Sequence, residues 1–363
     1  MQQESAAEFI LAKKRDQCYD LNVHDEKMKD SNTEKYLGDI FSNDGKSDSN
    51  IHDRVLRAYS YLSEIRALLT DMPFGKRRIQ IGLMLRDAMF VNGILFNSEA
   101  WHSIQLKHLE ELEVIDRTLM RFIIGAHSKT PSEVLYLETG TIPLRYIITI
   151  RRILYFQNII TRTDQELIKR VYIAQKTDPV KGDWINYLKE DFEYLGEEVN
   201  EEEAMATPRF EYKKLIKDRV RQKVFEDLKA VQSSHSKVKD IFYDTFKIQE
   251  YMKNHILTNH EISLLFSLRS RTMRSVVNNF GRNINCSLGC SVPENQEHWL
   301  SCGKTTSNKN TDIVYSDMFG SLTQQTNVVK LFAQLEEERM ELHPVAPSSP
   351  MADNIGPRPS PGP

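Results

Sequence analysis

The residues best suited to chemistry are three cysteines and a histidine near the C-terminal end of the chain. They are Cys286, Cys290, His298 and Cys302, in a Cys-x3-Cys-x7-His-x3-Cys spacing. Two closely spaced thiolates can supply one side of a tetrahedron, and a histidine and a cysteine with three residues between them can supply the other. This is the geometry of a structural Zn(II) site. Four protein ligands leave no position for a catalytic water. We therefore predict a structural zinc ion that folds this segment.

The alternative interpretation is three buried cysteines beside an unrelated histidine, because a free cysteine behaves as a small hydrophobic residue. The surrounding residues are polar and include glycine and proline, which favours the metal. His255 and His260 are possible competing ligands, although a helix surface is the preferred interpretation for both. The fourth cysteine, Cys18, stands alone, so the distribution fits a metal site in a reducing compartment better than a disulfide framework.

Basic residues gather in two segments despite a net charge of −3. Residues 51–163 hold fifteen Lys and Arg against eleven acids, and residues 251–310 hold seven against three. These small excesses fit a solvated helix face as well as a phosphate-binding one. The arginines that precede the cysteine cluster, with Phe280 among them, could grip phosphates while the aromatic ring stacks on a base, or they could simply be exposed at a helix end. These arginines are Arg269, Arg271, Arg274 and Arg282.

Other chemistries find no support in the sequence. It contains no Walker loop, no Gly-rich dinucleotide turn, no His-Glu-x-x-His helix and no Gly-x-Ser-x-Gly elbow. Asp44, Gly45 and Asp48 do not follow the spacing of an EF-hand calcium loop. We also find no run of about 18 uncharged apolar residues and no basic flank before the first apolar stretch, so we expect neither a signal peptide nor a membrane span.

The apolar residues recur mostly with a helical period, which predicts a mainly α protein. Three helices at about 51–72, 76–100 and 106–125 should form a compact bundle. A short strand at 35–41 precedes them and leads into a polar loop. Further helices are predicted at 132–138, 144–161, within 164–200 (anchored by Trp184 and Tyr187), and at 208–232, 236–250 and 258–277. The acidic run at 197–203 is predicted to be a solvated linker and a domain boundary, and the proline-rich tail at 343–363 to be disordered.

Several short sequence motifs occur in an order that resembles a known family. Tyr-Leu-Gly stands at 36–38, Pro-Ser-Glu-Val-Leu-Tyr-Leu-Glu-Thr-Gly at 131–140, Ile-Pro-Leu-Arg at 142–145, and the Cys-Cys-His-Cys cluster follows. Together they resemble the region after the palm of non-LTR (LINE-type) retrotransposon reverse transcriptases. The resemblance covers about residues 8–342.

The resemblance implies a role for each part of the chain. Residues 1–50 would be the end of the palm with a primer-grip-like hairpin at Tyr36, Leu37 and Gly38. Residues 51–163 would be the helical thumb, 164–250 a helical linker region, and 251–342 a zinc-knuckle module that binds RNA or DNA, closed by short helices at 315–342. Candidates for contacts with the nucleic-acid backbone in the thumb, chosen by charge and position, are Arg54, Arg57, Lys76, Arg77 and Arg78.

The family's polymerase motif, a Tyr-x-Asp-Asp turn that binds two Mg(II) ions, does not occur in this sequence. We therefore expect a nucleic-acid-binding fragment of a reverse transcriptase that does not polymerise by itself. The alternative is a transposon-derived helical scaffold or protein-interaction module without nucleic-acid function. A third possibility is that the sequence is a truncated reading of a gene for a full reverse transcriptase. A continuous basic face would favour the first over the second. By analogy we expect an intracellular protein, in the nucleus or cytoplasm, that self-associates through exposed apolar surface.

Overall fold

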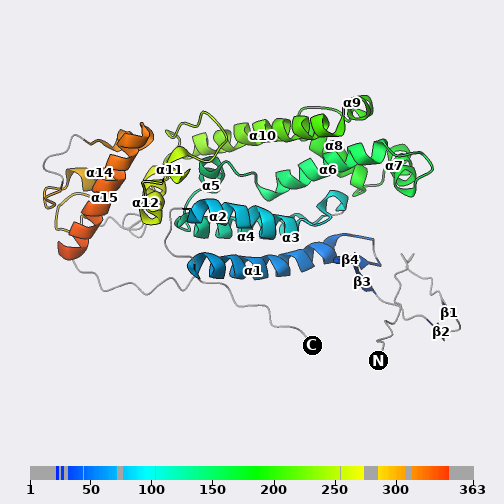
Figure 1. Cartoon of the computed structure of the whole chain (residues 1–363), viewed down its shortest axis with the longest axis horizontal. Helices are drawn as coiled ribbons and strands as arrows, with labels where there is room; N and C mark the ends of the chain where they lie inside the picture. The colour runs from blue at the N-terminus through cyan, green and yellow to red at the C-terminus, as the bar shows by residue number, and fades with distance from the viewer. Residues whose placement is uncertain are drawn as a thin grey trace.

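The computed structural model describes residues 32–43, 45–71, 77–102, 104–253, 255–273, 285–307 and 313–342, together with the short strands β1 (Asn22–Val23) and β2 (Glu26–Lys27). These residues are mainly helical, as predicted (Figure 1). The predicted disordered tail and Cys18 lie outside them. No described helix has both the length and the apolar character needed to cross a membrane.

The Tyr-Leu-Gly motif forms the tip of a β-hairpin. Strands β3 (Thr33–Tyr36) and β4 (Asp39–Ser42) pair antiparallel, with Tyr36 opposite Asp39. Leu37 and Gly38 both have positive φ angles, 48° and 91°, as the two central residues of a type I′ turn require. The prediction of a single strand across this segment was therefore wrong, because the turn falls in the middle of it.

The predicted three-helix bundle is present. Helix α1 (Asp48–Asp71) packs on α4 (Leu106–Ile124), and α2 (Arg78–Leu85) continues through a π-helical turn (η1, Arg86–Val91) into the short α3 (Asn92–Ile94). The second helix was predicted to reach residue 100, but it ends earlier. Helix α3 ends at Ile94, and Asn97 then adopts a left-handed conformation before a short 3₁₀ turn (η2, Ser98–Ala100).

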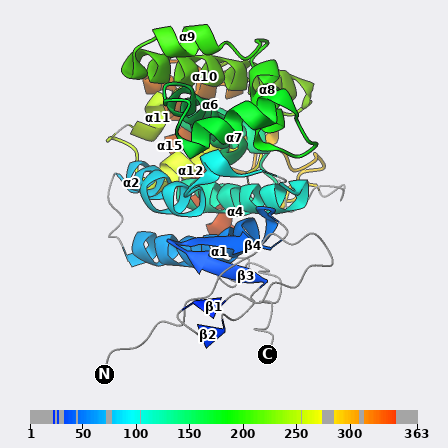
Figure 2. The same cartoon turned by 90° about the vertical axis from the view of Figure 1, so that its right-hand side faces the viewer.

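The next helices stack on this bundle in layers. Helices α5 (Ser132–Thr139) and α6 (Leu144–Ile160) follow α4, and α10 (Arg209–Ser234) packs on both of them. Figure 2 shows the order of the layers, from α1 through α2 and α4 to α6 and then α10, with α9 beyond α10 at the top edge. Helices α7 (Leu167–Thr177) and α8 (Trp184–Tyr194) cover α6.

The acidic run at 197–203 is not a solvated linker, which corrects the prediction. Part of it forms helix α9 (Glu201–Ala206), whose Ala204 is fully buried. The side-chain amide of Gln157 on α6 donates to the backbone oxygens of Ala204 and Thr207, at 3.0 and 2.9 Å. Buried apolar residues from Ile51 to Leu335 form one cluster that runs through this part of the chain.

A non-helical connection follows α10, where a helix at 236–250 had been predicted. Only α11 (Glu250–Lys253) forms, before α12 (Asn259–Arg269), which begins with a capping box at Thr258. The prediction for this last helix extended to 277, and residues 274–277 lie outside the described part. Helices α14 (Gln296–Ser301) and α15 (Leu322–Leu342) and the 3₁₀ turn η3 (Tyr315–Phe319) complete this end of the molecule (Figure 1).

The connection after α10 lies against the Leu-Glu-Thr-Gly motif at the end of α5. The backbone N–H of Gln249 donates to the backbone oxygen of Glu138 at 2.9 Å. Gly140 has a φ of +63°, and a Cβ there would lie only 2.5 Å from the Cα of Lys247. Glycine is therefore required at this position by both the backbone conformation and the close approach.

The carboxylate of Glu138 is completely buried and has three side-chain donors. The hydroxyls of Tyr243 and Tyr251 donate to it at 2.9 and 3.0 Å, and the Nε of Arg269 at 2.9 Å. Arg269 also donates to the backbone oxygen of Met318 at 2.9 Å. Burial would lower the pKa of Arg269, but the charge of Glu138, the two tyrosines and the hydrogen bond to Glu138 together outweigh it and raise that pKa, so the guanidinium stays charged. This network joins α5, α11, α12 and η3.

We expect Glu138→Gln to destabilise the fold strongly. The amide leaves the buried Arg269 guanidinium without a counter-charge, which typically costs about 3–5 kcal/mol of unfolding free energy. Urea denaturation followed by circular dichroism measures it. Glu211→Gln, at an exposed position of α10, is the matched control and should change the free energy by less than about 0.5 kcal/mol. Equal stability of the two variants would show that the network does not hold the fold together.

Candidate metal centre

Cys286 and Cys290 flank a tight turn that brings their side chains together. The backbone N–H of Cys286 donates to Val292 O at 2.8 Å, next to a β-bridge between Asn285 and Pro293. Gly289 has a φ of +84° and donates its N–H to Cys286 O at 2.9 Å. This left-handed residue closes the loop, so both thiols face the same side.

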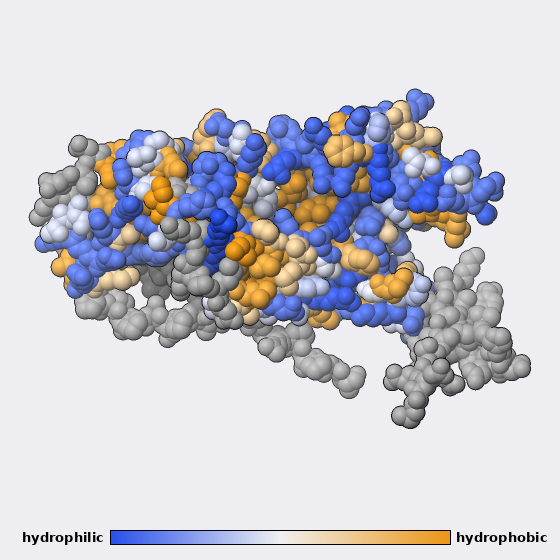
Figure 3. All heavy atoms as spheres, viewed as in Figure 1, coloured by the Kyte–Doolittle hydropathy of each residue, from blue (hydrophilic) through white to orange (hydrophobic). Residues whose placement is uncertain are grey.

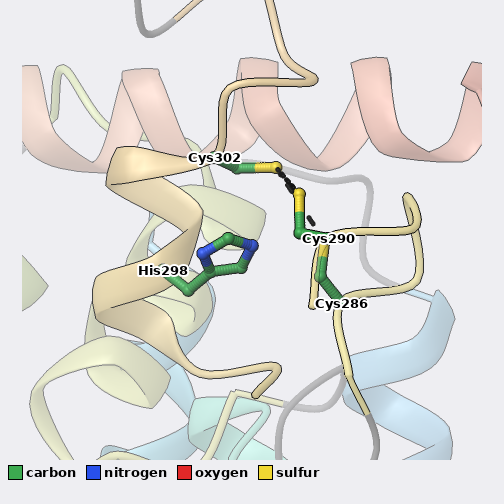
Figure 4. Close-up of side chains that lie close together, drawn as sticks. All are labelled: Cys286, Cys290, His298 and Cys302. Carbon is green, nitrogen blue, oxygen red and sulfur yellow. Dashed lines mark hydrogen bonds between the residues drawn. The ribbon is translucent and has the colours of Figure 1, made fainter. Parts of the chain in front are cut away.

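His298 and Cys302 come from α14 and the residue that ends it. Asn295 caps the helix, its side-chain oxygen accepting from the backbone N–H of His298 at 2.6 Å. Residues four apart lie on the same face of a helix, so the imidazole and the thiol point the same way. Figure 4 shows the His298 ring facing the two cysteines of the loop, with the sulfur of Cys302 beside that of Cys290.

The four predicted ligands lie close enough to hold one metal ion. Their ligand atoms all lie within 4.8 Å of one another. The Sγ of Cys302 is 3.9 Å from that of Cys286 and 3.8 Å from that of Cys290. The Nε2 of His298 is buried and has no hydrogen-bond partner among the described residues. A buried nitrogen without a partner is costly, and a metal ion would satisfy it.

The crowded thiols affect one another's ionisation. Burial alone would raise the pKa of Cys286, but hydrogen bonds, first among them one from Arg339, outweigh it and lower that pKa to about 6. Burial and hydrogen bonds with the other two thiols raise the pKa of Cys290 to about 11. The thiolate form is therefore favoured at Cys286 and opposed at Cys290.

A second layer of charged residues surrounds the ligands. Arg339 of α15 is buried, and its guanidinium lies 3.4 Å from the Sγ of Cys286 and 2.6 Å from the carboxylate of Glu294. The same guanidinium stacks over the ring of Trp299, 4.5 Å from its centroid. Glu294 also accepts the backbone N–H of Ser287 at 2.7 Å. These contacts fix the ligand loop to the last helix.

Sequence reasoning did not identify Arg339 or Glu294 as parts of this centre. Glu294 lies between the second and third ligands, so its place in the sequence was a usable signal. Arg339 comes from 37 residues beyond Cys302, and only the packing of α15 brings it to the thiols. No spacing pattern could have indicated it.

Two of the arginines predicted to contact nucleic acid are internal. Arg54 is 1% exposed, and its guanidinium is bound by Asp39 at 2.5 Å and by the backbone oxygen of Gly38 at 3.0 Å. Arg269 is 4% exposed and binds Glu138. Neither can reach a phosphate as placed, so both interpretations are corrected: these arginines hold the hairpin and the C-terminal helices in position.

The other predicted basic residues do not form a continuous basic face among the described residues. Arg57 pairs with Asp53 at 2.7 Å, and Arg271 with Glu297 at 2.5 Å. The guanidinium of Arg78 stacks on Phe122, 5.0 Å from the ring centroid. Arg77 is exposed at the start of α2. Lys76, Arg274 and Arg282 lie outside the described residues.

The structure also shows where the predicted primer-grip residues and the two alternative histidine ligands lie. Tyr36 and Leu37 are exposed at the hairpin tip, at 65% and 77%. His260 lies 3.5 Å from Glu336 of α15, so it is an inter-helix contact. His255 is exposed. Neither histidine belongs to the metal-ligand cluster.

Removal of one ligand should abolish tight metal binding. We expect the purified protein to bind one Co(II) ion with the strong visible absorbance of a tetrahedral thiolate site, and Cys302→Ser to lose that absorbance because a ligand is missing. The control His260→Gln should keep it. Undiminished absorbance in Cys302→Ser would rule out the four-residue centre.

Arg339 should strengthen metal binding without being a ligand. Replacement by Met preserves much of the packing on Trp299 but removes the donor to the Cys286 sulfur, and outer contacts of this kind are typically worth about 10- to 100-fold in metal affinity. Competition with a chromophoric chelator measures the change. Arg271→Met, which removes an exposed ion pair, should leave the affinity within about twofold.

Comparison with known protein family models, curated proteins and solved structures found no match. What the centre can do therefore follows from its own geometry. That geometry is a set of three thiols and one imidazole, largely buried, which could hold a metal ion and is fixed to α12 and α15 by the contacts of Gln296 and Arg339.

Proposed function

We propose that the Cys286, Cys290, His298 and Cys302 centre binds structural zinc. A tetrahedral Zn(II) ion with Zn–S bonds of about 2.3 Å sets its sulfurs about 3.8 Å apart. The Sγ separations of 3.8 and 3.9 Å in the structure fit this edge of the tetrahedron. They are far too long for a disulfide, whose sulfurs lie about 2.05 Å apart.

The charge around the ligands supports zinc in a structural role. Three thiolates and a neutral imidazole around Zn(II) carry a net charge of −1, and the buried Arg339 guanidinium would offset it next to Cys286. Four protein ligands complete the tetrahedron, which leaves no open position for a reacting water. The ion would then contribute to folding this end of the molecule.

We further propose that the chain is a nucleic-acid-binding fragment of a LINE-type reverse transcriptase that does not polymerise alone. The observation that carries this proposal is the metal-ligand cluster, which follows a β-hairpin, a three-helix bundle and the Leu-Glu-Thr-Gly helix in the same order as in the family it resembles. The polymerase carboxylate motif is missing from the sequence. Binding of RNA or DNA is the part of the family's function that needs no such motif.

A second candidate is a protein-interaction scaffold. Arg54 and Arg269 are internal, and Arg57 and Arg271 pair with acids, so the predicted basic face is interrupted. Apolar side chains are instead exposed on the hairpin and α1, which fits self-association or a protein partner. These side chains are Tyr36, Leu37, Phe41, Leu56, Tyr59 and Leu68.

The two functions differ in how the protein responds to salt and to loss of the metal. We expect the zinc-loaded protein to bind a labelled RNA stem-loop or DNA duplex in fluorescence anisotropy, with an affinity that falls as salt increases. A Cys286→Ser/Cys290→Ser variant should bind at least tenfold more weakly because its C-terminal module is no longer folded.

Two results would decide against nucleic-acid binding through this module. If the zinc-loaded protein binds neither probe at low salt, the scaffold function becomes the better one. If the double serine variant binds as tightly as the parent, the metal centre has no part in binding. Sedimentation of the same samples reports on self-association, which the scaffold function predicts.

A further inference from the structure

Helix α10 carries a cluster of exposed cations that have no partner among the residues the structure describes. Arg209, Lys213, Lys214 and Lys217 are exposed, and none of them forms an ion pair or side-chain hydrogen bond with any residue that the structure describes. We call these four residues the α10 stripe. They lie in a segment, 164–250, that is acidic overall.

The other cations of the same helix are used differently. Arg219 binds Glu197 and Glu203, Lys223 binds Asp227, and Arg221 donates to backbone oxygens that include that of Gly140. These interactions tie the helix to its neighbours. The α10 stripe makes no such contribution, so the fold does not account for it.

The stripe occupies one side of the helix together with an exposed aromatic ring. At 3.6 residues per turn, its four cations span an arc of about 140°, and Phe210 projects within that arc. Phe210 is 80% exposed. The acids of this stretch, Glu211 and Asp218, lie beyond the edge of the arc. The cations are therefore not interleaved with acids on their own face.

The acids of the neighbouring helix are largely engaged elsewhere. On α9, Glu201 accepts from Tyr172 and Lys176, and Glu203 accepts from Arg219. Glu202 of α9 is exposed, as are Glu211 and Asp218 of α10, and none of these three acids forms an ion pair with a residue that the structure describes. The four cations of the stripe therefore face solvent without an ion-pair partner among the described residues.

The charge density of the stripe matches that of a nucleic-acid strand. Residues 209 to 217 rise about 12 Å along the helix, so the four cations follow one another at an average spacing of about 4 Å along its axis. One strand of a duplex carries a phosphate about every 3.4 Å along the axis. An exposed aromatic ring beside such a groove or stripe can stack on an unpaired base of any sequence.

We propose that the α10 stripe binds the phosphate backbone of a single-stranded nucleic acid, with a base stacked on Phe210. This inference rests on the proposed nucleic-acid-binding function and adds a second contact surface to it. Figure 1 shows α9 and the start of α10 at the opposite end of the molecule from α14. Figure 3 shows mostly hydrophilic residues along the edge over α10.

An anionic membrane fits this surface less well. A helix that lies in a membrane interface buries its apolar face there, whereas Tyr212, Ile216 and Val220 of α10 are already buried in the protein core. Phe210 and the exposed Met205 of α9 would be the apolar residues left for insertion. The apolar face of α10 is therefore not available to a membrane, and only its charged face is exposed.

The test compares two variants that lose the same charge. The stripe variant is Arg209→Gln/Lys213→Gln/Lys214→Gln/Lys217→Gln. The control variant removes four exposed cations that lie apart in the sequence and outside the zinc module: Arg170→Gln/Lys181→Gln/Lys239→Gln/Lys247→Gln. Binding of labelled oligouridylate and oligothymidylate to the zinc-loaded protein is measured by fluorescence anisotropy over a range of salt, and circular dichroism checks that each variant is folded.

We expect the stripe variant to bind at least tenfold more weakly at low salt, and its log–log salt slope to fall by about three, since each phosphate contact on a single strand contributes about 0.7. The control variant should stay within about threefold of the parent. Phe210→Ala should weaken single-strand binding about five- to hundredfold and duplex binding much less.

Equal binding by the stripe variant and the parent would overturn the assignment of α10 while leaving the proposed function intact. Equal losses in the stripe and control variants would also overturn it, because net charge alone would then explain binding. If the parent binds no oligonucleotide at low salt, the proposed function and this inference both fail. Binding to phosphatidylserine vesicles in that case would identify the stripe as a membrane contact instead.

Discussion

The buried carboxylate of Glu138 is the interaction on which the arrangement of this molecule depends. It accepts from Tyr243, Tyr251 and Arg269, which come from three different segments after α10. A buried charge that loses its partner costs several kcal/mol, so these segments cannot leave α5 separately. Because Arg269 also binds the backbone of η3, the same carboxylate helps to set where α12 and α15 lie. The metal centre contacts both of those helices, and its position therefore follows from an acid in the middle of the chain.

The elements that could be predicted from the sequence are those in which apolar periodicity alone decides the structure. Helices α1, α4, α5, α6 and α10 all lie within a few residues of their predicted ranges, because each has a stripe of residues that must be buried. The failures have tertiary causes. The segment 236–250 has helical periodicity, but Tyr243 and the backbone of Gln249 are held by Glu138, and Gln232 donates to the backbone oxygens of Val238 and Ile241. A helix there would lose these buried hydrogen bonds.

The candidate site likewise has one part that could be predicted from the sequence and one part that could not. Its four ligands were predictable because each pair lies within one turn of chain, so local geometry brings the ligand atoms together. The basic residues were not, because charge and position cannot distinguish an arginine that faces solvent from one in a buried ion pair. Arg54 and Arg269 belong to the second kind, as do Arg86 with Asp116 and Arg152 with Asp191. In this fold the arginines of the core are structural, and a basic segment is therefore poor evidence for a basic surface.

The converse holds for α10, where an acidic segment presents a basic surface. Averaging over 164–250 adds the acids of α9 to the cations of α10, but in the folded chain Glu201 and Glu203 are bound by other residues and the stripe remains uncovered. The buried face of α10 is fixed on α5 and α6, so the backbone positions from which the exposed cations project are fixed as well. Cations on a fixed helix lose less backbone entropy on binding than cations on a mobile loop. This is why the stripe, and not the more basic segments of the sequence, is the surface best prepared to meet a strand of phosphates.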